Sequence, residues 1–371
     1  MKIQAPKATD HLPPTVLARR RGGTLVENHP PQPRGSVKRC RSVAGRWIRY
    51  STAILAVIVA APLFACQIPV FRYALERWSA DRYEIIVLHD GPLQAAQQKQ
   101  LTQLRDSNFE SPLAGNFDVK TVSAADIKNP RLQRAWDQRT SKTQPLLVAQ
   151  YPPGTKDVPD RVAMEAALTQ ESASQIADSP VRTEITKRLL QGESAVWIFV
   201  PSGDADQDAT ALKTLTEQVK LNESELELPV QDEIETEEDL LTASHLELRI
   251  KFSIVTLQRT DPNEQFLLSS LLHSEPDLLT LDEPMAFPVL GRGRVLYGLV
   301  GKGISSATIS AVSQFIIGPC SCQVKNQNPG FDLLLTTDWD KQLFGEDSRR
   351  PTQAKPAAPV QLTIPAGKSD R

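Results

Sequence analysis

Cysteine is scarce in this chain, and a strong charge excess of either sign is absent. The 371 residues hold four cysteines, of which Cys66, Cys320 and Cys322 lie at or beyond the apolar segment described below. A disulfide-built scaffold is therefore excluded, and burial of apolar side chains has to stabilise the fold. The formal net charge is −2, from 42 basic and 44 acidic residues. This balance argues against nucleic acid as a partner.

Catalytic motifs of high specificity are also missing. The sequence contains no Gly-x-Ser-x-Gly nucleophile elbow, no His-Glu-x-x-His helix and no recognisable pair of catalytic carboxylates. These absences weaken the case for an enzyme without excluding one. The remaining signals concern location, architecture and two thiols.

The clearest positive signal is an uncharged run at residues 53–66, preceded by Arg46 and Arg49. Its 14 residues would rise about 21 Å as a helix, less than the roughly 30 Å of a bilayer core, so the run is typical of an export signal. The end of the run, Leu63-Phe-Ala-Cys66, resembles a bacterial lipobox, which implies lipid attachment at Cys66. The alternative is an uncleaved span that continues through Ile68 to Val70, where about 18 residues reach about 27 Å.

Both alternatives place the chain from residue 80 onward outside the cytoplasm, because the upstream arginines hold their side of the segment inside. We therefore predict a membrane-anchored protein of the bacterial envelope, with most of the chain extracytoplasmic. Residues 1–50 are basic and rich in proline, and they are predicted to be a disordered tail unless translation starts near Val43.

Charge patterning divides the exported part into two small α/β units. Residues 222–240 carry nine acidic side chains and no basic one, which predicts an extended linker. The predicted organisation is a disordered region (1–50), a signal or transmembrane anchor (51–70), a first α/β domain (80–222), an acidic linker (223–244), a second α/β domain (245–340) and a disordered tail (341–371).

Hydrophobic periodicity predicts alternating strands and helices in the first unit. The expected strands are 83–88, 117–122, 146–149 and 195–200, and the expected helices are 93–104, 126–137, 180–190 and 206–220. Ser179-Pro180 is a typical helix start, with a capping hydroxyl followed by proline at the first helical position. Alternation of this kind favours a mostly parallel sheet covered by helices.

The second unit is predicted to combine a hairpin with two helices. The expected elements are a strand at 246–259, a helix from Asp261 with Glu264 completing a capping box, a hairpin of 287–290 and 295–300 around Gly291–Arg294, a helix at 305–317 and a strand at 331–335. This order resembles the later part of a thioredoxin-like fold, although the Cys-x-x-Cys motif of thioredoxins is absent. A shared order of strands and helices does not by itself indicate a shared function.

The candidate chemical site is Gly318-Pro-Cys-Ser-Cys322, where Cys320 and Cys322 could act jointly in redox chemistry or bind copper or zinc. Against a reactive thiolate, Cys320 follows the C-terminus of a predicted helix, and Lys325 is the one nearby positive charge. A closed zinc site needs four ligands, and the only downstream histidines, His245 and His273, have no recognisable spacing. The expectation is therefore a structural disulfide or two buried thiols, with no cofactor.

A second glycine-rich stretch, Gly301-Lys-Gly-Ile-Ser-Ser306, follows a predicted strand and opens a helix. It lacks the third glycine and the downstream acidic residue of a dinucleotide site, and Lys302 is followed by glycine instead of the serine or threonine of a P-loop. A turn capped by Ser305 or Ser306 is expected here.

These signals together predict a non-catalytic interaction or assembly module of the cell envelope, in contact with the membrane and an envelope protein. The alternative function is a thiol-redox or soft-metal-handling envelope protein that works through Cys320 and Cys322. Enzymatic activity stays open, with its absence favoured.

Overall fold

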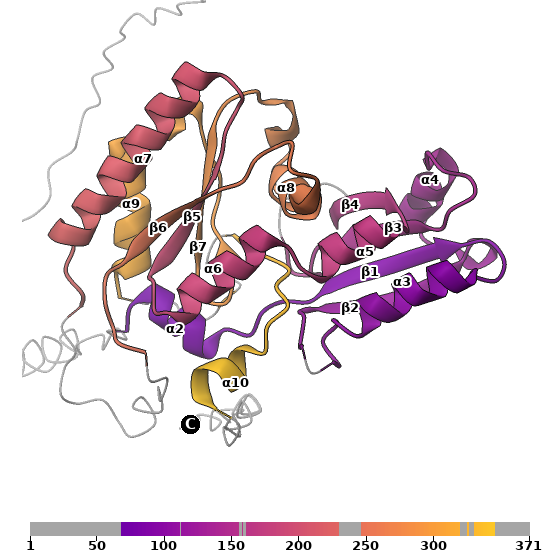
Figure 1. Cartoon of the computed structure of the whole chain (residues 1–371). Helices are drawn as coiled ribbons and strands as arrows, with labels where there is room; N and C mark the ends of the chain where they lie inside the picture. Colours follow the sequence, from indigo (N-terminus) through magenta and orange to yellow (C-terminus); the bar gives the residue numbers. More distant parts are fainter. Residues whose placement is uncertain are drawn as a thin grey trace, which may run out of the picture. The chain divides into compact units, whose positions relative to one another are not determined.

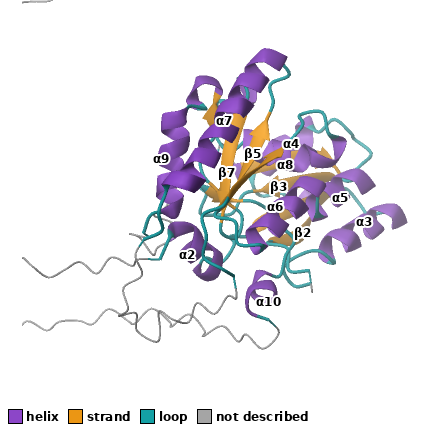
Figure 2. Ribbon diagram, turned by 60° about the vertical axis from the view of Figure 1, so that its left-hand side comes forward, coloured by secondary structure: helices purple, strands orange, loops and turns teal. Residues whose placement is uncertain are grey.

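The computed structural model describes residues 68–111, 113–155, 158, 161–229, 246–319, 325 and 330–345. These residues form two β-sheets, each with helices on both faces (Figure 1, Figure 2). The protein is thus of the α/β class. Cys66, Cys320, Cys322 and most of the predicted anchor lie outside the described residues.

The first sheet has the strand order β2-β1-β3-β4. Its strands are β1 (Tyr83–His89), β2 (Phe117–Ser123), β3 (Leu146–Gln150) and β4 (Val162–Ala167). Helix α3 (Ala95–Arg105) connects β1 to its parallel neighbour β2, whereas β3 runs antiparallel to both β1 and β4. The 3-10 turn η1 (Ala124–Asp126) and helix α4 (Pro130–Gln138) lead from β2 to β3, and α5 (Gln170–Ala177) follows β4.

The second sheet has the order β10-β8-β7-β5-β6, and β9 pairs with β7. Its strands are β5 (Ala195–Val200), β6 (Phe252–Thr256), β7 (Met285–Leu290), β8 (Arg294–Val295), β9 (Leu299–Val300) and β10 (Phe331–Asp332). The remaining elements are α2 (Val70–Arg77), α6 (Pro180–Leu190), α7 (Ala205–Glu225), η3 (Pro262–Glu264), α8 (Gln265–Leu272), η4 (Leu278–Thr280), η5 (Gly301–Gly303), α9 (Ser306–Ile317) and α10 (Trp339–Phe344).

One apolar core runs across both sheets. It contains Val87 of β1 and Leu147 of β3 from the first sheet, together with Ile198 of β5 and Phe287 of β7 from the second, and Phe266 of α8 is buried among them. A second cluster lies between the other face of the second sheet and helices α2, α7 and α9, which Figure 1 shows along that sheet. A third cluster lies between the first sheet and α4. Burial on both faces explains why the central strands are almost wholly apolar.

The expectation of a mostly parallel sheet is wrong. In the part of the chain that the structure describes, each sheet has one parallel pair, β1–β2 and β5–β6, and its other pairs are antiparallel. Alternation of strands and helices along the sequence does not fix which strands become neighbours. Here β3 returns beside β1 in the antiparallel direction and does not extend the sheet beyond β2.

The two sheets do not divide at the acidic segment. Strand β5 and helix α7, which the sequence assigned to the first unit, belong to the second sheet, because β5 pairs with both β6 and β7. Helix α7 continues to Glu225, and Glu223 Oε1 accepts a hydrogen bond from Phe252 N at 2.6 Å. The first residues of the predicted linker are therefore helical, and residues 230–245 lie outside the described part of the chain.

Several predicted elements are confirmed with small shifts. Helix α6 and strand β5 have the expected bounds, and the side chain of Ser179 accepts from Arg182 N as the N-cap of α6. The hairpin of β7 and β8 turns through Gly291 and Gly293, which both have positive φ. Strand β6 is shorter than expected, and α4 begins at Pro130. Strand β4 and helix α5 were not predicted from the sequence.

The predicted capping box at Asp261 is half correct. Asp261 accepts from Asn263 N at 2.9 Å, but Glu264 turns away and its Oε1 accepts from Val181 N at 2.7 Å, in the first turn of α6. A long-range partner therefore replaces the local one.

The N-terminal end of the described chain bears on the longer anchor alternative. Ile68 and Val70 are buried within the protein, and Val70 is the first residue of α2. These two side chains pack against protein and do not extend an apolar span. Among the described residues, no helix combines the length and apolar character that crossing a bilayer requires.

Candidate functional site: a polar groove between α6 and the C-terminal segment

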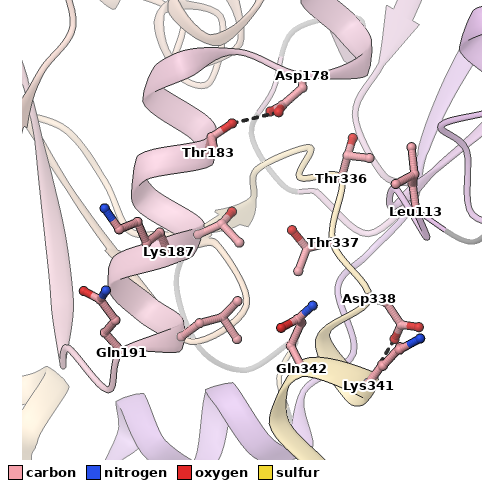
Figure 3. Close-up of a pocket in the computed structure, with 12 residues that line it drawn as sticks. Leu113, Asp178, Thr183, Lys187, Gln191, Thr336, Thr337, Asp338, Lys341 and Gln342 are labelled. Carbon is pink, nitrogen blue, oxygen red and sulfur yellow. Dashed lines mark hydrogen bonds between the residues drawn. The ribbon is translucent and has the colours of Figure 1, made fainter. Parts of the chain in front are cut away.

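An open groove of about 590 Å³ lies among the described residues. One wall is helix α6, and the other is the extended segment 336–338 with the first turns of α10 (Figure 3). Its lining residues are Leu113, Asp178, Thr183, Thr186, Lys187, Leu190, Gln191, Thr336, Thr337, Asp338, Lys341 and Gln342. Most of these residues have hydroxyl, amide or charged side chains, although their apolar atoms supply the larger share of the exposed lining.

Helical spacing explains the first wall. Thr183, Thr186, Lys187 and Leu190 follow one another at intervals of three, one and three residues, and therefore lie on one face of α6. The opposite face of α6 carries Ile185 and Leu189 into the main core. The helix is thus amphipathic, with its polar side turned to the groove.

Arg182 holds the two walls together. This residue is 1% exposed, and its Nη1 donates to Leu334 O at 2.9 Å and to Ile176 O at 3.2 Å. Its Nε donates to Ser179 Oγ at 3.1 Å, and its guanidinium lies 5.2 Å from the ring centre of Phe266. Burial lowers the pKa of Arg182 to about 10, against the opposing effect of the Asp178 and Glu264 charges. The guanidinium therefore stays charged at neutral pH and fixes the segment before Thr336 against α6.

Three further contacts restrain the residues that line the groove. Thr336 Oγ1 donates to Ala177 O, just before α6, and Thr183 Oγ1 donates to Asp178 Oδ2 at 2.7 Å. Asp338 caps α10 by accepting from Lys341 N at 3.1 Å. Figure 3 shows Thr337 and Gln342 facing the side of α6 that carries Thr183. The groove is therefore built from restrained backbone.

The groove presents polar groups that could contact a ligand. The side chains of Thr186, Thr337 and Gln342 form no hydrogen bond with other described residues, so their polar groups are available to a ligand. Its described lining contains no histidine or cysteine and no aromatic ring.

The predicted cysteine sites lie outside the described residues, but their neighbours are described. Pro69 and Pro319 pair in an isolated antiparallel bridge, and Val70 N donates to Gly318 O at 3.0 Å. Pro69 is three residues after Cys66, and Pro319 directly precedes Cys320. The two stretches of chain that carry the thiols therefore start from adjacent points.

Lys325 has a different environment from the one that thiol activation requires. Its Nζ lies 3.0 Å from Asp81 Oδ1 and also contacts Asp332 Oδ2, while Arg294 Nη1 lies 3.3 Å from Asp332 Oδ1. Burial and the Asp332 charge raise the pKa of Asp81, and Lys325 opposes that rise. The carboxylates of Asp81 and Asp332 thus balance the positive charge of Lys325, which was the candidate partner for a thiolate at Cys320 or Cys322.

The expected turn at the second glycine-rich stretch is confirmed. Gly301–Gly303 form the short 3-10 turn η5, and the hydroxyl of Ser305 accepts from Thr308 N as the N-cap of α9. Thr308 Oγ1 in turn accepts from Ser305 N at 3.2 Å, which completes a capping box. The hydroxyls of Ser305 and Thr308 therefore cap the N-terminus of α9.

The groove itself was missed by sequence reasoning. The polar face of α6 was visible as Thr183, Thr186 and Lys187, but such a face usually contacts solvent. The opposing wall comes from residues more than 140 positions later, and no local pattern links the two. The pairing depends on Arg182, whose burial the sequence does not reveal.

Comparisons with known proteins add little. No protein-family model and no curated protein sequence matches the chain. Among solved structures, the chain is similar to the first two thioredoxin domains of Eps1p from Naumovozyma dairenensis, with 11% identity and a TM-score of 0.18. That alignment covers 67% of this chain and 93% of the other. A TM-score of this size carries no argument about fold or function.

Proposed function

We propose that the protein is a non-catalytic interaction module of the bacterial cell envelope and that it holds a polar partner in the α6–α10 groove. The observation that carries this proposal is the groove itself, with its restrained walls and unused hydroxyl and amide groups. Small-molecule pockets are mostly apolar and enclosed, whereas this groove is open, and hydroxyl, amide and charged groups interrupt its apolar surface. An extended polar chain or a polar protein surface fits it better.

Attachment to the membrane belongs to the same proposal. It is supported by the arginine-flanked apolar run and by the lipobox-like Leu63-Phe-Ala-Cys66. The buried side chain of Ile68 lies two residues after Cys66, so a lipid on Cys66 would hold the folded part close to the bilayer surface. A diacyl group with a third, amide-linked chain would make that attachment stable.

Site-specific crosslinking in the native membrane tests the groove. A photoreactive amino acid replaces Gln342 in the groove, and in a matched control it replaces Thr216 on the exposed side of α7. We expect one defined adduct from position 342 and none from position 216, and we expect Thr186→Trp to abolish the adduct by filling the groove. Equal labelling from both positions, or an adduct unchanged by Thr186→Trp, would contradict the groove as the partner site.

Intact mass of the membrane-extracted protein tests the location. We expect a chain that begins at Cys66 and carries acyl groups. An uncut chain without fatty acid in the soluble fraction would overturn the envelope assignment, whatever the crosslinking result.

A second candidate function is thiol redox or soft-metal handling at Cys320 and Cys322, with copper or zinc as the metal. The Pro69–Pro319 bridge favours it, because the bridge brings together the chain segments that lead to the cysteines. Cys66 and Cys322 are each three residues from the bridge, and three residues of extended chain span about 10 Å. The ion pairs of Lys325 with Asp81 and Asp332 argue against it, because they compensate the positive charge that would stabilise a thiolate.

Thiol counting separates the two functions. Acylation converts the sulfur of Cys66 to a thioether, so the mature protein should present two thiols after reduction, Cys320 and Cys322. Slowly reacting thiols and unchanged partner crosslinking in Cys320→Ser would reject the redox candidate. Rapid reversible oxidation, or stoichiometric copper or zinc retained by the wild type and lost in Cys320→Ser, would favour it.

A further inference from the structure

The outer edge of β2 is open to another strand. Tyr83 N donates to Asn116 O at 2.9 Å, so the backbone groups of even-numbered residues in β2 point toward β1 and those of odd-numbered residues point away. Phe109 N donates to Phe117 O at 3.1 Å and covers the first outward position. No described residue hydrogen-bonds to the outward backbone groups of Val119 and Thr121 or to the N–H of Ser123, whereas the carbonyl of Ser123 begins the 3-10 turn η1.

A hollow lies beside this edge, where the loop after α3 leads into β2. Its volume is about 480 Å³, and its lining residues are Arg105, Asp106, Asn108, Glu110, Ser111 and Val119. Two carboxylates and one guanidinium line it, and neither Asp106 nor Glu110 forms an ion pair with a described residue. The hollow therefore has a negative balance directly next to unused backbone donors and acceptors.

The charged side chains of β2 itself face away from this hollow. Asp118 and Lys120 alternate with Val119 along the strand and lie on the other face, where Arg82 pairs with Asp118 at 3.3 Å and Lys120 with Glu84 at 2.6 Å. The hollow thus lacks a cation from its own strand.

We propose that the edge from Val119 to Ser123 binds an extended peptide segment of another protein by strand addition, and that the hollow receives a lysine or arginine side chain of that peptide. Main-chain hydrogen bonds to Val119, Thr121 and the N–H of Ser123 supply affinity, and the carboxylates of Asp106 and Glu110 supply selectivity. This surface is separate from the α6–α10 groove, and the proposal does not depend on the membrane anchor.

A second copy of the chain fits the same edge less well. Antiparallel pairing of two β2 edges would place outward residues opposite outward residues, so valine, threonine and serine would face the hollow. The lysine at position 120 of the copy would lie on the wrong face. Charge complementarity therefore favours a different, basic peptide.

The test measures binding of a labelled peptide to the full-length protein. The probe is a fluorescein-labelled heptapeptide of alternating valine and threonine with one central lysine, followed by fluorescence anisotropy. Thr121→Pro removes one outward N–H and keeps the ladder to β1, and Thr121→Val is its matched control with the N–H intact. We expect Thr121→Pro to weaken binding about tenfold and Thr121→Val to change it less than about twofold. Ser123→Pro serves as a second edge variant if Thr121→Pro fails to fold.

Charge selectivity is tested in the same assay. The double variant Asp106→Asn, Glu110→Gln should lose about fivefold in affinity for the lysine peptide and almost nothing for the same peptide with norleucine in place of lysine. Binding that is insensitive to both edge proline variants would overturn strand addition. Equal affinity for the lysine and norleucine peptides would overturn the basic partner. Self-association that Thr121→Pro abolishes, without peptide binding, would assign the edge to a second copy and also overturn the proposal.

Discussion

Asn116 and Leu335 exchange a pair of hydrogen bonds: Asn116 N donates to Leu335 O at 3.2 Å, and Leu335 N donates to Asn116 Oδ1 at 2.7 Å. The amide nitrogen of the same side chain donates to Asp81 O at 2.8 Å and to Leu333 O at 3.0 Å. Asn116 directly precedes β2, and Leu335 follows β10 of the other sheet. One buried amide therefore mimics a strand partner and fastens the C-terminal segment to the first sheet.

Removal of this amide should be costly. Asn116→Ala leaves the N–H of Leu335 and the carbonyls of Leu333 and Asp81 without their partner in a buried place, so we expect the free energy of unfolding to fall by about 3–5 kcal/mol. The control Asn129→Ala removes the exposed cap of α4, which accepts from Arg131 N at 2.9 Å, and should cost about 1 kcal/mol. Urea unfolding measures both, and equal losses would contradict the fastening role of Asn116.

Local patterns in the sequence were sufficient for elements whose determinants are adjacent. The bounds of α6 follow from Ser179-Pro180 and the apolar stripe after it, and the cap of α9 follows from Ser305. Strand β5 is apolar throughout because both of its faces are covered, and that pattern is visible without a structure.

Features that depend on distant partners were not predictable in the same way. Glu264 had the spacing of a capping box, yet its carboxylate binds Val181 N in another helix. Strand β4 contains three alanines and no aromatic residue, so its strand propensity is weak and tertiary packing decides its conformation. The groove requires Arg182 to join α6 to Leu334, a contact across 152 positions that no sequence period encodes.

Arg182 offers a second prediction. Lysine keeps the positive charge at this position, but its three N–H groups extend from one nitrogen, whereas Arg182 reaches its acceptors from separate nitrogens. Arg182→Lys should therefore lose part of the set formed by Leu334 O, Ile176 O and Ser179 Oγ. We expect a loss of about 2–4 kcal/mol of unfolding free energy together with weaker crosslinking from the groove. The control Arg188→Lys changes a partly exposed guanidinium on the same helix and should cost less than about 1 kcal/mol. A crosslinking yield that stays at the wild-type level in Arg182→Lys would show that Arg182 does not shape the groove.

Gly291 should tolerate no side chain. Its φ is +58°, and an added Cβ would lie 2.6 Å from Ala74 Cβ and 2.9 Å from Ala74 C, in α2. Gly291→Ala therefore combines backbone strain with a clash against a neighbouring helix, and we expect a loss of more than about 2 kcal/mol. Gly203 has φ +101° with open space around the position of its Cβ, so Gly203→Ala carries the backbone strain alone, about 1–2 kcal/mol. Thermal unfolding of the two variants separates strain from contact, and equal shifts in Tm would disprove the close approach of α2.

Glu264 should make stability depend on pH in an identifiable direction. Burial raises its pKa above 4.5, and the hydrogen bonds from Val181 N and Ser179 and the charge of Arg182 oppose that rise. The folded state therefore holds the proton more tightly than the unfolded state, and the resulting stabilisation is complete below the unfolded pKa and is lost as the pH rises through the folded pKa. Glutamine keeps the acceptor for Val181 N but cannot ionise. The free energy of unfolding of Glu264→Gln relative to wild type should accordingly be more favourable at about pH 7 than at about pH 4, as measured by urea unfolding across that range.

Among the described residues, Asp81 is another carboxyl group with a raised pKa, but it is present in both proteins and cancels in this difference. Glu264→Ala removes the acceptor as well, leaves Val181 N without its partner at the start of α6, and should therefore lose stability at every pH. If the difference between Glu264→Gln and wild type stays constant with pH, or becomes less favourable as the pH rises, the carboxyl of Glu264 is not the group whose ionisation opposes folding. In that case the contact between α6 and η3 acts through the hydrogen bond to Val181 N alone.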